Sequence, residues 1–80
     1  MPYIPGNRRK DIAMGDSPKT LGELTYVLYI TCLDYVQARP PYSYELLGAT
    51  IGAIDCAKLE LYRRLLAAYE DTKIRENGDI

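Results

Sequence analysis

Basic and aromatic side chains form the most chemically suggestive cluster of this 80-residue sequence. Tyr62 precedes Arg63 and Arg64, and Lys58 lies about one helical turn earlier. Guanidinium groups match phosphate and carboxylate, and a tyrosine ring can stack on a nucleotide base. These four residues are therefore candidates for binding a phosphorylated small molecule. The alternative is that Arg64 pairs with Glu60 and that Arg63 is a solvated surface residue.

A second basic group, Arg8-Arg9-Lys10, lies near the N-terminus. Arg8 and Arg9 are candidates to contact phosphate or an acidic partner surface, although three basic residues are a weak signal. The formal net charge is −1, from ten basic and eleven acidic side chains. Proteins that coat nucleic acid usually carry a strong basic excess, so generic nucleic-acid binding is not expected.

Histidine and the sequence motifs typical of common enzyme classes are missing from the sequence. It contains no histidine, and its two cysteines cannot form a four-ligand zinc site. Glu70 and Asp71 are adjacent, so on a helix their carboxylates point apart. Glycine-rich phosphate loops and nucleophile elbows are also missing. We expect a protein that is not an enzyme and that needs no cofactor or metal.

The apolar segments are short. Residues 1–10 are polar and contain two prolines, unlike a secretory signal, and Leu24–Leu33 is about half the length that spans a bilayer. Cys32 and Cys56 have apolar neighbours and are expected to be reduced, buried thiols. The sequence thus predicts a cytoplasmic protein that does not insert into membranes.

An all-α fold is predicted, with a first helix at about residues 21–37. Thr20 and Glu23 have the spacing of a capping box, and Arg39-Pro40-Pro41 stops the helix. Residues 25–31 are rich in β-branched and aromatic side chains and are compatible with a strand. The cap and the long unbroken run favour the helix.

A second helix is predicted at about residues 44–76, after the N-cap residue Ser43 and before a C-terminal cap at Asn77-Gly78. Near Ala68 the sequence is compatible with either one long helix or a long helix followed by a short one. Residues 1–19 read as an irregular arm with a short helical turn near residues 10–14, and residues 20–80 as a helical hairpin domain. One apolar stripe follows the second helix: Leu47, Ile51, Ile54, Leu61, Leu65 and Ala68.

Small residues form a ridge along the first half of this second helix. Glycine inside a helix costs about 1 kcal/mol relative to alanine. Close approach of another helix would offset that cost, and a ligand lying against the exposed backbone is the alternative. The residues expected in helix–helix interfaces are Gly48, Gly52, Cys56, Ala49, Ala53, Leu24 and Leu28.

Two helices of these lengths cannot enclose a core between themselves. The first is apolar around most of its circumference, with Glu23 and Asp34 as the only charges between Leu21 and Gln37. Soluble monomers rarely leave so large an apolar patch exposed. We therefore expect a homo-oligomeric helical bundle, with a two-fold dimer as the simplest assembly and higher symmetric assemblies as alternatives.

Several segments resemble a family of small uncharacterised proteins encoded by bacteriophages and prophages. The similar segments are Tyr3-Ile4 with Arg8-Arg9, residues 22–27 (GELTYV), residues 51–64 (IGAIDCAKLELYRR) and residues 69–79 (YEDTKIRENGD). The resemblance implies a phage setting in the cytoplasm of a bacterial host, but no established activity. Small helical oligomers in that setting commonly act by binding.

Three functions are compatible with these features. The first is a homo-oligomeric binding protein that engages a host protein stoichiometrically. The second is a sponge that sequesters a small nucleotide signal through Arg63, Arg64 and an arm residue. The third is a purely structural assembly protein.

Overall fold

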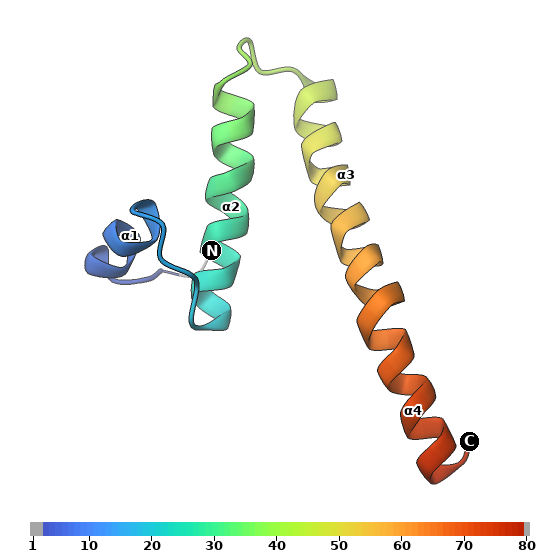
Figure 1. The fold of residues 1–80 in the computed structure, drawn as a ribbon. Helices are drawn as coiled ribbons and strands as arrows, with labels where there is room; N and C mark the ends of the chain where they lie inside the picture. Colours follow the sequence, from blue (N-terminus) through green and yellow to red (C-terminus); the bar gives the residue numbers. More distant parts are fainter. Residues whose placement is uncertain (1–2, 80) are drawn as a thin grey trace. The chain divides into compact units, whose positions relative to one another are not determined.

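The computed structural model describes residues 3–79, which form helices and contain no strand. The helices are α1 (Gly6–Ala13), α2 (Leu21–Gln37), α3 (Tyr44–Leu61) and α4 (Ala67–Asn77). A π-helical segment, η1 (Tyr62–Leu66), joins α3 to α4 (Figure 1). The predicted all-α fold is confirmed. The chain divides into two compact units, Met1–Tyr42 and Ser43–Ile80.

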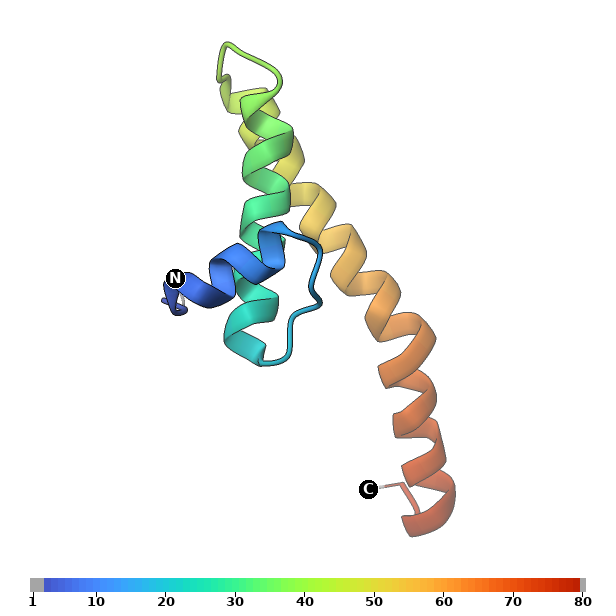
Figure 2. The ribbon, with the colours of Figure 1, turned by 60° about the vertical axis from the view of Figure 1, so that its left-hand side comes forward.

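The first unit contains α1 and α2, and α1 lies beside the N-terminal half of α2 (Figures 1 and 2). The sequence predicted an irregular arm here, with only a short turn near residues 10–14, and that prediction is wrong. Pro5 precedes the first turn with a φ of −58°, which suits a helix start, and Gly15 follows the helix with a φ of 104°. The helix has no side-chain cap to indicate it from sequence.

α2 occupies the residues over which the first helix was predicted. The Thr20 hydroxyl accepts a hydrogen bond from the Glu23 backbone N–H at 3.1 Å, which is the expected N-cap. Thr25, one of the residues that suggested a strand, donates its hydroxyl to the carbonyl of Leu21 at 3.0 Å. The helix accommodates this β-branched residue through that local bond, one turn back.

In the second unit, α3, η1 and α4 follow one another without a break (Figure 2). The Ser43 hydroxyl accepts a hydrogen bond from the backbone N–H of Leu46 at 3.0 Å, so the predicted start is confirmed. The predicted end is confirmed as well: Gly78 adopts a φ of 82° and its N–H donates to the carbonyl of Ile74. The irregularity expected near Ala68 lies slightly earlier, at η1, and takes the form of a widened turn rather than a break.

Apolar side chains are largely exposed in both units. Val36, at 6% exposure, is the one buried apolar residue between Tyr3 and Asp79. The residues of the stripe in the second unit, such as Ile51, Leu61 and Leu65, are each more than half exposed. Neither unit therefore has an enclosed hydrophobic core of its own.

Candidate functional site

An ion-pair cluster centred on Arg8 joins α1 to the start of α2. The Arg8 guanidinium donates to both carboxylate oxygens of Glu23, from Nε at 2.9 Å and from Nη2 at 2.7 Å. Its Nη1 donates to Asp16 at 2.7 Å and to Asp11 at 3.2 Å, and its Nη2 also donates to the carbonyl of Ser17 at 3.3 Å. We call these residues the Arg8 clamp, because one side chain holds three separate parts of the first unit.

Glu23 is the nearly buried partner in the Arg8 clamp, with a side chain only 9% exposed. Its carboxylate also accepts the backbone N–H of Lys19 at 3.0 Å. The predicted capping box therefore needs correction: the carboxylate reaches one residue beyond the N-cap residue Thr20. The same carboxylate accepts two hydrogen bonds from Arg8 on α1.

The electrostatics of the clamp favour the ionised form of each member. The Arg8 hydrogen bonds, then the Lys19 N–H, lower the pKa of Glu23 from 4.5 to about 2. Arg8 also lowers the pKa of Asp16, and the hydrogen bonds that Arg8 donates to Glu23 and Asp16 raise the pKa of Arg8 itself. Arg8, predicted as a ligand-binding residue, thus already directs its donors to partners inside the chain.

Arg9, the other arm residue predicted to bind a ligand, lies differently. Its Nη1 donates to the carbonyl of Ile4 at 2.7 Å, and its side chain is exposed. Arg8 and Arg9 therefore serve different parts of the first unit, and α1 does not present them as a pair.

The predicted basic cluster of the second unit gathers around one carboxylate. Glu60 accepts hydrogen bonds from Arg64 at 2.8 Å and from Arg63 at 3.0 Å. Both bonds lower the pKa of Glu60, and the bond from Arg64 has the larger effect. Lys58 lies 3.5 Å from Asp55. Arg63 and Arg64 are both about two-thirds exposed. Two guanidinium groups share one carboxylate, so a net positive charge faces solvent, where it can attract an anion or an acidic protein surface.

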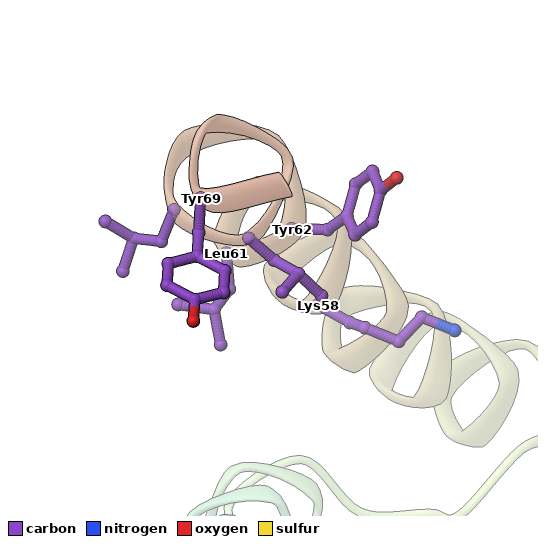
Figure 3. Close-up of a pocket in the computed structure, with 6 residues that line it drawn as sticks. Lys58, Leu61, Tyr62 and Tyr69 are labelled. Atoms are coloured by element: carbon purple, nitrogen blue, oxygen red, sulfur yellow. The ribbon is translucent and has the colours of Figure 1, made fainter. Parts of the chain in front are cut away.

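An apolar hollow lies on the same helix, beside η1 (Figure 3). We call it the η1 hollow, and six residues line it: Lys58, Leu61, Tyr62, Leu65, Leu66 and Tyr69. The predicted binding residues are thus divided, because Lys58 and Tyr62 line the hollow whereas Arg63 and Arg64 do not. The ring of Tyr69 also has the Lys73 ammonium 5.5 Å from its centroid.

The η1 segment changes which residues share a face. A π turn inserts one extra residue, so every later position is set back by about 100° around the helix. Leu66 and Tyr69 thereby take the places that Leu65 and Ala68 would occupy on a straight helix. Ala68, predicted in the apolar stripe, is accordingly not among the residues that line the hollow, and Tyr69 is.

The ridge of small residues lies along α3, and its role in an interface stays a prediction. Apart from the nearby backbone of α3 and the adjacent residues, no described atom lies within 4 Å of the position that a Cβ would take at Gly48 or Gly52. Cys56 on the ridge is a free, exposed thiol, so the expectation that it is buried is not met within this chain, and Cys32 on α2 is partly exposed. The other predicted interface residues are also exposed: Ala49, Ala53, Leu24 and Leu28.

Two further tests concern membranes and metals. Between Tyr3 and Asp79, none of the helices combines the length and apolar character that crossing a bilayer requires. The same residues contain no group of three or more histidine, cysteine or acidic side chains that could hold a metal ion.

Comparison with known proteins identifies the family. The whole chain, residues 1–80, matches a family described as a domain of unknown function, DUF6899, and the protein belongs to that family. No curated protein and no solved structure matches the chain.

Proposed function

We propose that this chain is a small binding protein of phage or prophage origin that works as a homo-oligomer in the bacterial cytoplasm. It engages a host protein in a fixed stoichiometry. The phage setting is supported by the resemblance of residues 51–64 and 69–79 to phage-encoded proteins, and the mode of action by the composition of the helices.

One observation carries the proposal: most of the large apolar side chains among residues 3–79 are exposed. Leu24 and Leu28 on α2 and Ile51, Leu61 and Leu65 on the second unit are exposed, and Val36 is the one buried apolar residue among residues 3–79. Fully burying such a side chain stabilises a protein by about 1.5–3 kcal/mol. Association of several copies is the simplest way to gain that stabilisation.

The assembly is tested by multi-angle light scattering on the full chain between about 1 and 100 μM. Each chain has a mass of 9.1 kDa. We expect a mass at a whole multiple of that value, two or more. A mass of one chain at the highest concentration overturns the assembly.

The partner is tested by expressing the tagged chain in a bacterial host and measuring purified complexes by native mass spectrometry. We expect a host protein at a constant ratio to the chain, retained through repeated washing. The comparison variant is Arg63→Ala with Arg64→Ala, which removes the exposed basic cluster and leaves the apolar stripe. It should lose the host protein and keep its oligomeric mass. Recovery of the chain alone, with no host protein at a constant ratio, contradicts the binding function.

A further inference from the structure

The η1 hollow has an internal symmetry along the helix. Its six lining residues fall into three pairs, and the two members of each pair are equally distant from the point between Arg63 and Arg64. The pairs are Lys58 with Tyr69, Leu61 with Leu66, and Tyr62 with Leu65. The lining positions therefore have the same spacing when they are counted from either end of the helix, although only the Leu61–Leu66 pair joins identical side chains.

Such a surface fits a second copy of itself. Across a two-fold axis, residue i contacts residue j and residue j contacts residue i, and antiparallel helices reverse the order of their positions. An axis between Arg63 and Arg64 sets Leu61 of each copy opposite Leu66 of the other. It also sets the aliphatic stem and ammonium of Lys58 against the ring of Tyr69. Each of these contacts occurs twice.

We propose that the η1 hollow is where a second copy of this chain docks, with the two helical runs 44–77 crossing antiparallel about an axis between Arg63 and Arg64. This contact rests on the proposed homo-oligomer and specifies one of its interfaces. The widened turn at η1 contributes to this contact, because a regular α-helix would place Ala68 at the position where Tyr69 contacts Lys58 of the other copy.

The charged residues that flank the hollow are also complementary when the order of positions is reversed in the second copy. The antiparallel crossing brings Lys58 of one copy near Glu70 of the other, and Asp55 near Lys73. Both pairs join opposite charges, and the two-fold axis duplicates each. Within one chain, Lys58 and Asp55 are well exposed and 3.5 Å apart, so both remain accessible to a second copy. A parallel pairing would instead set each charge beside its own copy.

The basic cluster lies outside this contact. Arg63 and Arg64 do not line the hollow, and helical geometry places them on the far side of the turn. The crossing therefore buries apolar side chains and leaves four guanidinium groups at its outer surface, each pair held by a Glu60 carboxylate.

Distance measurement between spin labels tests the crossing in the full chain, with Cys32→Ser and Cys56→Ser removing the native thiols. One variant carries Arg63→Cys, next to the axis, and the other carries Tyr44→Cys, at the start of α3. With a rise of 1.5 Å per residue, the Tyr44 positions of two antiparallel copies lie about 60 Å apart, whereas the position-63 labels are separated by less than about 30 Å. A parallel pair gives a short distance at both positions.

Light scattering on the same samples separates the possible failures. Short distances at both positions, or a long distance at position 63 in a protein that is still oligomeric, overturn the antiparallel crossing and leave the homo-oligomer standing. A monomeric mass overturns both. The expected result is an oligomeric mass, a short distance at position 63 and a long one at position 44.

Charge exchange provides an independent test. We expect Lys58→Glu alone to raise the dimer dissociation constant about tenfold, because the axis converts two attractive pairs into repulsive ones. Adding Glu70→Lys should return it to within about twofold of the wild type. On a single helix these residues are roughly 18 Å apart, so the rescue cannot arise within one chain.

The matched control for this exchange is Arg63→Glu, a charge reversal on the far side of the same turn. It should leave the dissociation constant unchanged within about twofold. Failure of Glu70→Lys to rescue Lys58→Glu overturns the proposed register, even where each single variant weakens the dimer.

Discussion

The Arg8 clamp makes a prediction that can be followed at one carboxylate. Arg8→Ala removes two hydrogen bonds to Glu23, at 2.9 and 2.7 Å, while the backbone N–H of Lys19 remains. The guanidinium is the largest cause of the lowered pKa of Glu23, which lies near 2 rather than 4.5. We expect the substitution to raise this pKa most of the way toward 4.5, and to leave it below that value because the Lys19 N–H, which lowers the pKa more than burial raises it, still donates to the carboxylate.

The dependence of stability on pH follows from this shift. Glu23 is ionised in the folded protein under more acidic conditions than in the unfolded chain, so the clamp contributes its full stabilisation above pH 4.5. That contribution is lost as the pH falls through about 2. Asp16, whose pKa Arg8 also lowers, adds to the same acidic loss. In Arg8→Ala, most of the pH dependence from these two carboxylates should disappear.

The assay is a carboxyl-carbon NMR titration of Glu23 together with the melting temperature between pH 7 and pH 2. Arg9→Ala is the matched control, because it removes a neighbouring guanidinium that contacts the carbonyl of Ile4 and not Glu23. Arg8→Lys keeps the charge but not the two-pronged geometry, so it should give an intermediate pKa. A Glu23 midpoint near 4.5 in the wild type, or one that Arg8→Ala leaves unchanged, refutes the reasoning.

Three further outcomes are expected. Thr20→Ala removes the N-cap of α2 and should lower the free energy of unfolding by about 1 kcal/mol; an unchanged denaturant midpoint contradicts that role for the hydroxyl. Gly52→Leu should destabilise the assembly by about 1–3 kcal/mol if a helix covers the ridge, whereas Gly52→Ala on an open ridge should add about 1 kcal/mol of helix propensity. If Arg63 and Arg64 bind a nucleotide signal, cyclic or linear nucleotides should raise the melting temperature of the protein. Arg63→Ala with Arg64→Ala should abolish this rise without dissociating the oligomer. Absence of any rise in the wild type counts against the nucleotide sponge.

The features that the sequence predicted correctly are those that depend on neighbours within four residues. The caps at Thr20 and Ser43 and the end at Gly78 each involve a bond to the adjacent turn. The helix over residues 25–31 was predicted for the same reason, because an unbroken run after a good cap outweighs β propensity.

The features that the sequence did not predict depend on longer separations or on helix phase. Arg8 and Glu23 are fifteen residues apart, so nothing local indicated that they pair or that α1 forms around them. The η1 segment adds one residue to a turn without any proline or glycine to mark it. That single residue was enough to replace Ala68 by Tyr69 on the apolar face.

The second unit has three surfaces of different composition: the ridge of small residues, the apolar stripe and the basic cluster. Their arrangement indicates the order in which assembly and partner binding occur. The ridge of Gly48, Gly52 and Cys56 is rotated by about 140° from the apolar stripe, so a single neighbouring helix cannot cover both. The arginines lie on the far side of the η1 hollow. We therefore expect the apolar contacts to form first and the basic cluster to meet a partner only on the assembled protein. Variants that weaken the assembly, such as Lys58→Glu, should then weaken partner binding as well. Arg63→Ala with Arg64→Ala should lose the partner alone.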